Sequence, residues 1–178
     1  MEREQAFALL TAEQPEPHMV QHALASEAVM QRLAEHFGED ALLWGITGLL
    51  HDIDFPHTRE TPEQHGVQAE AMLAGKLAPE LVYAIKAHNS EYTGAEPKTR
   101  LDYALRAAET VTGLIAAAAL MRPTGMEGME VKSIKKKMKD KAFAASVSRE
   151  RIRECEQAGV PLDTFLALSI EAMQGQQA

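Results

Sequence analysis

Cysteine is nearly absent from this chain, since Cys155 is the only one in 178 residues. A lone cysteine cannot form an internal disulfide, and such a composition is typical of proteins from a reducing compartment. The first residues also lack the charged and then apolar pattern of a secretory signal. We therefore expect the protein in the cytoplasm.

Long apolar runs and an excess of basic residues are missing as well. The longest stretch of small apolar residues, 113–121, is too short to cross a bilayer, so no membrane partner is expected. The formal net charge is -8 at pH 7, whereas nucleic-acid binders normally carry an excess of lysine and arginine. No glycine-rich phosphate loop is present either. These absences favour a small molecule as the ligand.

The chain does have a large share of helix formers. Hydrophobic residues make up 46% of the sequence, enough for a buried core, and the length fits one domain, 1–178. Eight prolines separate segments whose apolar residues recur three or four positions apart. This spacing predicts helices near 2–11, 17–37, 39–52, 61–76, 79–89, 98–121, 130–139, 148–158 and 162–174. No strand pattern, repeat or flexible linker competes, so the predicted fold is all-α, a single-domain helical bundle.

The most informative residues are the neighbours His51 and Asp52, which follow the apolar run 41–50. An apolar helix gains nothing from an imidazole beside a carboxylate, so the pair predicts a bound ligand. Upstream, His22 shares a helical face with core residues, where a buried ring needs partners for both nitrogens. The alternatives are a hydrogen-bonded core histidine at position 22 and a polar helix cap at 51–52.

Three further donors follow downstream. His65 and His88 each lie on a predicted helix, and Glu109 lies deep in the apolar segment 98–121. Imidazole nitrogens and carboxylate oxygens together suit one or two divalent transition metals. Each residue also has a plainer explanation: a solvated position for His65, a helix end for His88, and an ion pair with Arg106 for Glu109.

Other polar residues border this set. Asp54 and His57 lie in a loop expected beside the cleft, where Asp54 either orients a ligand histidine or caps a turn. Asp102 precedes Glu109 by seven residues on nearly the same helical face, so either acid could face the cleft. The alternatives are that Asp102 is only a first-turn acid near the helix N-terminus and that Arg106 forms ion pairs with both acids. The lysines of 132–141 are interpreted as a solvated helix face, with help in phosphate binding as the alternative.

These residues resemble the HD-domain superfamily of metal-dependent phosphohydrolases. More narrowly, they resemble a group of small bacterial HD-domain proteins described only as hydrolases. The segments that carry the resemblance are 49–54, 64–66, 87–89, 107–115, 122–123 and 139–144, so nearly the full length is covered. The resemblance implies a motif core at about 17–123 and a C-terminal helical extension at about 124–178.

The resemblance also implies roles for individual residues. The implied metal ligands are His22, His51, Asp52, Glu109, His65 and His88. His22, His51 and Asp52 match the first ligands of the family, whereas His65 and His88 match those that hold a second ion. Asp52, His65 and His88 are also the implied catalytic residues. At the last ligand the family has aspartate, and the extra methylene of Glu109 moves its carboxylate by more than about 1 Å.

The implied activity is that of a metal-dependent phosphohydrolase acting on a small phosphate ester, with nucleotides among the candidates. The implied cofactor is one or two divalent ions of Mn, Fe, Co, Ni or Zn. Two alternatives stay open: a di-iron oxygenase of the same superfamily, and a catalytically degenerate protein that only binds its ligand. The expected partner is a small phosphorylated substrate, not nucleic acid or a membrane, and a homodimer is left open.

Overall fold

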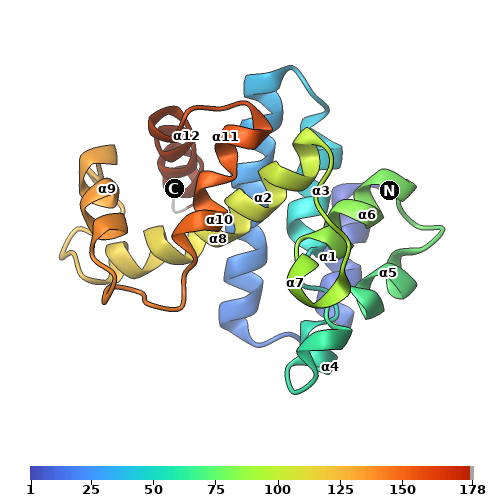
Figure 1. The fold of residues 1–178 in the computed structure, drawn as a ribbon. Coiled ribbons are helices and arrows are strands. Elements are labelled where there is room, and N and C mark those ends of the chain that lie inside the picture. The colour runs from blue at the N-terminus through green and yellow to red at the C-terminus, as the bar shows by residue number, and fades with distance from the viewer. Residues whose placement is uncertain (177–178) are drawn as a thin grey trace.

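The computed structural model describes residues 1–176, which form helices joined by turns (Figure 1). Within that range no strand is formed, and the predicted all-α class is confirmed. The longer helices are α1 (Arg3–Ala12), α2 (Pro17–Phe37), α3 (Ala41–Leu50), α6 (Pro79–Ala87), α8 (Arg100–Leu120), α9 (Val131–Lys139) and α12 (Leu162–Gly175). The shorter ones are α4 (Phe55–Thr58), the 3-10 helix η1 (Pro62–Gln64), α5 (Val67–Leu73), α7 (Ser90–Thr93), α10 (Arg149–Arg153) and α11 (Cys155–Ala158).

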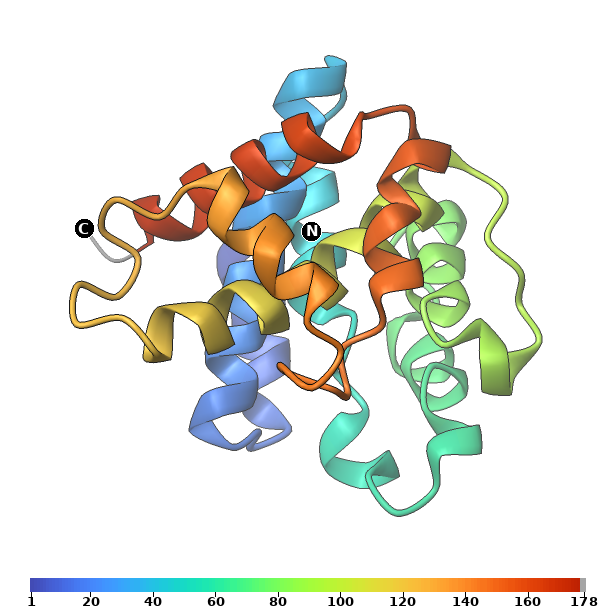
Figure 2. The same ribbon diagram turned by 60° about the vertical axis from the view of Figure 1, so that its left-hand side comes forward.

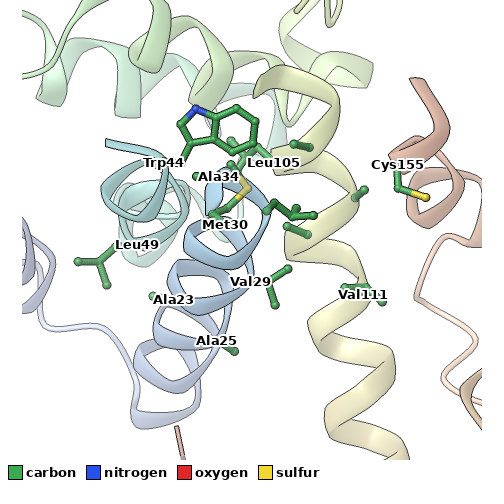
Figure 3. Close-up of a cluster of buried hydrophobic side chains, with 14 of the residues drawn as sticks. Ala23, Ala25, Val29, Met30, Ala34, Trp44, Leu49, Leu105, Val111 and Cys155 are labelled. Atoms are coloured by element: carbon green, nitrogen blue, oxygen red, sulfur yellow. The ribbon is translucent and has the colours of Figure 1, made fainter. Parts of the chain in front are cut away.

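The two 21-residue helices α2 and α8 form the centre of the molecule, and α3 packs along α2. In Figure 1, α9 and α12 lie on one side of this centre and α4 to α7 on the other, and in the turned view of Figure 2 α9 lies in front of the central helices. The apolar side chains of Val29 and Leu105 lie between α2 and α8, and Leu49 lies on the side of α3 away from α8; all three are fully buried (Figure 3). The core therefore fixes the helices that carry His22 and Glu109 relative to the helix that ends at the His51 turn.

The close contact between α3 and α2 depends on a glycine. A Cβ at Gly48 would lie 2.7 Å from the backbone oxygen of Ser26, a distance that real Cβ atoms essentially never show. Ser26 is one helical turn beyond His22, so this contact brings the end of α3 to the height of His22 on α2. Because Gly48 has no side chain, α3 can approach α2 closely enough for His51 to lie beside His22.

The N-terminus of α8 explains Asp102. The Thr99 hydroxyl accepts the N–H of Asp102, while the Asp102 carboxylate accepts the N–H groups of Lys98 and Thr99, both at 2.9 Å. Asp102 is therefore a capping residue and not a cleft acid. By length and composition α8 could cross a membrane, but its apolar window is 61% buried, as in the core helix of a soluble protein.

Two predicted helices are broken in the structure. The predicted helix 61–76 is interrupted at Gly66, whose φ of +89° is incompatible with a continuing helix, so only η1 and α5 form. The predicted helix 148–158 divides at Glu154 into α10 and α11. The single-turn helices α4 and α7 were not predicted, because one turn holds too few residues to show a period.

Candidate metal centre

His51 and Asp52 follow directly on the last turn of α3. His51 is 1% exposed, and its Nδ1 donates to the carbonyl of Gly48 at 2.7 Å. His88 follows α6 in the same way, and its Nδ1 donates to the carbonyl of Ile85. In both cases a carbonyl that the ending helix leaves free orients the ring, so Nε2 is the nitrogen left to bind an ion.

His22 on α2 and His65 between η1 and α5 complete two pairs of imidazoles. Nε2 of His22 lies 3.1 Å from Nε2 of His51, and Nε2 of His65 lies 3.0 Å from Nε2 of His88. The Nδ1 atoms of His22 and His65 are also bonded, to the Thr112 hydroxyl and to a carboxylate respectively. All four rings therefore direct Nε2 toward a paired ring.

The carboxylate of Asp52 lies between the two pairs. Its Oδ2 is 3.3 Å from Nε2 of His51 and 3.7 Å from Nε2 of His22. Its Oδ1 is 3.2 Å from Nε2 of His65 and 3.4 Å from Nε2 of His88. The donor atoms of each His–His–Asp triad lie within 4.8 Å of one another, and Asp52 belongs to both triads.

The chemistry of these donors fits a divalent transition metal. Two Nε2 atoms whose rings donate through Nδ1 face each other with their lone pairs, and they repel unless positive charge lies between them. A tetrahedral ion with bonds of about 2.1 Å holds its ligands about 3.4 Å apart, close to the spacings in both triads. Each triad can therefore hold one ion, with Asp52 shared between them.

The pKa shifts in the cluster differ in direction from one residue to the next. Burial raises the pKa of Asp52, but the charge of His51 and hydrogen bonds from the imidazoles outweigh it and hold that pKa well below its usual range. Burial lowers the pKa of His65, but Asp52 and Asp54 together raise it to about 10. Burial and the charge of His51 lower the pKa of His22. An ionised carboxylate thus faces imidazoles that compete for protons, and a bound cation would take the place of those protons.

A comparison with protein families agrees with this geometry. The family model for the HD domain matches residues 19–141, which is more than half of the chain. The chain belongs to the HD-domain family. This confirms the predicted membership and, with it, a superfamily of metal-dependent hydrolases. No curated protein and no solved structure matches the chain in the two other comparisons.

In this HD domain the sixth predicted donor, Glu109, stands outside both triads of the described residues. Its carboxylate accepts from the Thr110 hydroxyl and lies 3.5 Å from Nη1 of Arg151. Its backbone carbonyl accepts from the Thr112 hydroxyl at 2.7 Å, and that hydroxyl lies 3.0 Å from Nδ1 of His22. Glu109 therefore supports His22 through its main chain, and its role as a metal ligand stays a prediction.

Asp54 combines the two roles that the sequence left open for it. Its Oδ1 accepts from Nδ1 of His65 at 2.8 Å. Its Oδ2 accepts the backbone N–H groups of Gly66 at 2.7 Å and of Ala69 at 3.0 Å. One buried carboxylate thus caps the start of α5 and orients a candidate ligand ring.

His57 lies apart from this cluster. Its side chain is 51% exposed and Nε2 is 2.8 Å from Oε2 of Glu13, at the end of α1. The predicted loop position at 53–58 holds the short helix α4. His57 thus serves as a surface histidine close in sequence to the triads but outside them.

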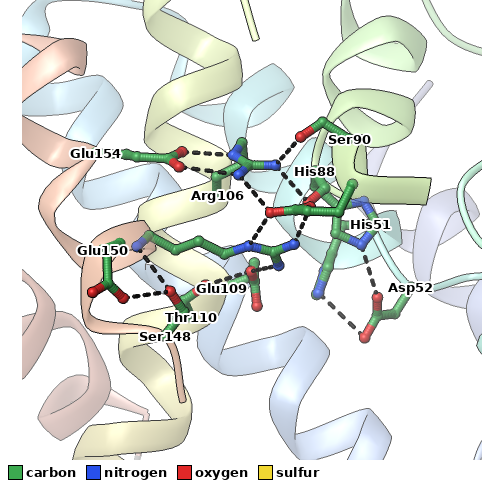
Figure 4. Close-up of polar contacts among 12 residues, drawn as sticks. His51, Asp52, His88, Ser90, Arg106, Glu109, Thr110, Ser148, Glu150 and Glu154 are labelled. Atoms are coloured by element: carbon green, nitrogen blue, oxygen red, sulfur yellow. Dashed lines mark hydrogen bonds and ion pairs between the residues drawn. The ribbon is translucent and has the colours of Figure 1, made fainter. Parts of the chain in front are cut away.

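Arg106 supports the turn that carries His88, and the sequence did not reveal this role. Its Nη1 donates to three acceptors around that turn: the carbonyls of Ala87 and His88, both at 3.1 Å, and the Ser90 hydroxyl at 2.8 Å. Its Nε and Nη2 donate to Glu154 at 2.6 and 3.0 Å (Figure 4). The ion pair of Arg106 with Glu109, weighed from the sequence, is therefore wrong. Free carbonyls at the end of a helix attract cations, so the predicted helix end at His88 was the one sequence feature that could have indicated a nearby arginine.

Two cavities lie next to the candidate centre. His22 and Gly113 line both of them. One has a volume of about 750 Å³, and its polar wall includes Tyr92, Glu109, Thr110, Ser146 and Arg151. The other has a volume of about 710 Å³, and its apolar wall includes Leu24, Ala25, Ala116 and Met173. Cavities of this size accommodate small molecules.

Proposed function

We propose that this HD-domain protein is a metal-dependent phosphohydrolase that acts on a small phosphate ester. His22, His51 and Asp52 would hold one ion, and Asp52, His65 and His88 a second. The observation that carries the proposal is the position of Asp52, whose two oxygens each face a separate pair of imidazoles. A carboxylate between two such donor sets is the arrangement that a pair of ions requires.

The side chains around the centre keep the donors in place. The carbonyl of Gly48 orients His51, the Thr112 hydroxyl orients His22, and the carboxylate of Asp54 orients His65. Such fixed rings lose little conformational entropy when they bind an ion. Because these partners occupy Nδ1, only Nε2 of each ring is presented for binding.

Bound divalent ions would lower the pKa of a water and offset the charge that develops on a phosphoryl oxygen. Asp52, His65 and His88 are the residues we expect next to the reacting atoms, because their donor atoms form the second triad. Asp52 would hold or bridge the ions through its ionised carboxylate and would lie beside the attacking water. We place this reaction in the cytoplasm, which the single buried Cys155 supports.

The experiment begins with the metal content of the purified protein, followed by phosphatase and phosphodiesterase assays with that metal restored. His51→Ala and Asp52→Ala should each lose metal and activity, since each removes a donor from the centre. His57→Ala is the matched control and should retain both, because His57 lies outside the triads. Equal metal content in all three variants would contradict the assignment.

The same experiment separates the alternatives. Consumption of dioxygen by the iron-loaded protein, without hydrolysis of any ester, would favour the di-iron oxygenase. A protein that takes up none of Mn, Fe, Co, Ni or Zn would favour a degenerate, ligand-binding HD domain. Metal analysis of Glu109→Gln tests the sixth ligand, since a residue that only hydrogen-bonds Thr110 and faces Arg151 should leave the metal content unchanged.

A further inference from the structure

Arg151 brings a positive charge to the candidate centre from outside the matched residues 19–141. It lies on α10 and lines the cavity of about 750 Å³ together with His22 and Glu109. The metal-centre assignment gives Arg151 no role. Its surroundings show how the guanidinium is held and which part of it is free.

One edge of the Arg151 guanidinium is fixed by Glu91. Nε donates to Oε1 of Glu91 at 3.2 Å, and Nη2 donates to Oε2. Glu91 also accepts from Nη2 of Arg106 at 3.2 Å, and Nη1 of Arg106 donates to the carbonyl of His88. The position of Arg151 is thus tied to the turn that carries a candidate metal ligand.

The other edge of the guanidinium faces the cavity. In the part of the chain that the structure describes, Nη1 of Arg151 forms no hydrogen bond, and its contact with Oε1 of Glu109 is 3.5 Å. A charge-assisted hydrogen bond would be about 2.7–2.9 Å. An arginine held on one edge, with donors left over on the other, is prepared to bind an anionic oxygen at little entropic cost.

We propose that Arg151 binds an anionic oxygen of the substrate in this cavity and so helps to determine which phosphate esters are accepted. The inference rests on the proposed function, because it places the ester between Arg151 and the metal triads. The rest of the ester would lie against Tyr92, which lines the same cavity and is 58% exposed. The ring of Tyr92 favours a flat organic group. The ligand class is therefore an organic phosphate with a planar substituent.

The test titrates inorganic phosphate into the full chain by calorimetry, with the protein both metal-loaded and metal-stripped. Arg151→Met should weaken phosphate binding by about tenfold or more, and Arg151→Lys should recover part of the loss. The matched control is Arg153→Met on the same helix, since Arg153 is exposed, forms among the described residues no ion pair other than that with Glu156, at 3.9 Å, and lies outside the cavity. The control should stay within about twofold of the wild type.

Two further readouts separate substrate binding from support of the centre. Arg151→Met should keep the metal content of the wild type and lose only the small stability contribution of its half-exposed ion pair with Glu91. With any ester that the wild type hydrolyses, it should raise KM more than it lowers kcat. A parallel loss of metal would mean that Arg151 only supports the centre, and the inference would then be wrong.

Equal phosphate affinity in the wild type and Arg151→Met would also overturn the inference, as would a wild type that binds no phosphate in either form. These outcomes differ from failure of the proposed function. If the proposed function fails, the wild type hydrolyses no ester even with metal restored. The phosphate titration of the wild type and Arg151→Met then still decides whether Arg151 binds an anionic oxygen.

Discussion

Replacing Asp54 by asparagine separates the charge of this residue from its shape. Asp54 is fully buried and accepts three N–H groups: Nδ1 of His65 on Oδ1, and the backbone N–H groups of Gly66 and Ala69 on Oδ2. An asparagine of the same size keeps one oxygen, so its NH₂ group must face either the ring or the two backbone donors. Facing the ring, the NH₂ group requires Nδ1 of His65 to accept, which moves the ring proton to Nε2.

The orientation toward the ring costs less, because it leaves both backbone N–H groups bonded. Hydrogen bonds to a charged group contribute about 1.5–3 kcal/mol each, against about 1 kcal/mol for neutral ones. Weakening the two backbone bonds in this way should lower the free energy of unfolding by about 1–4 kcal/mol. The displaced proton occupies the nitrogen that the second triad needs, so metal affinity should fall about 10- to 100-fold.

Urea denaturation of the metal-free protein measures the loss of stability, and metal titration measures the affinity. Asp163→Asn is the control, since Asp163 is 65% exposed and pairs with Lys135 at the surface. The control should change stability by less than about 0.5 kcal/mol. If Asp54→Asn loses stability but binds metal as tightly as the wild type, Asp54 only caps α5 and the reasoning about ring orientation is refuted.

Two more predictions concern the packing of α3 and the charge network. Gly48→Ala should lower the free energy of unfolding by about 1–3 kcal/mol, because the new Cβ meets the backbone oxygen of Ser26. Gly175→Ala, with nothing within 4 Å of its Cβ, is the control, and equal urea midpoints for the two variants would contradict the tight contact. For Glu91, burial raises the pKa, but the hydrogen bond from Arg151 and further partners lower it to about 2. A lowered pKa means stability that is present above about pH 4.5 and is lost as the pH falls toward 2. The side chain is 49% exposed, so solvent screens the effect to about 1 kcal/mol or less. The difference in free energy of unfolding between the wild type and Glu91→Gln should therefore shrink as the pH falls from 5 to 2.5. A difference that stays constant over this range would refute the lowered pKa of Glu91.

The sequence predicted the elements whose signals are local. Period and proline positions located the long helices α2 and α8 within one or two residues. They could not locate the break at Gly66, because glycine adopts negative and positive φ about equally well and the sequence does not show which it takes.

The same distinction applies to the candidate centre. Residue type alone indicated His22, His51, Asp52, His65 and His88, and the structure brings these five together. The residues that orient the imidazole rings could not be predicted from the sequence. A hydroxyl such as that of Thr112 is common, and it indicates a role only when its distance to Nδ1 of His22 is known. For Glu109 the sequence predicted the position on α8 but not the surroundings of the carboxylate, which bonds the Thr110 hydroxyl and lies near Arg151, 42 positions further along the chain.

Helices α10 and α11 both pack against α8. Glu154 follows α10 and binds Arg106, so the final quarter of the chain braces a turn that belongs to the matched family segment. A substitution at Glu154 would therefore disturb the His88 turn while every histidine of the two triads stayed unchanged.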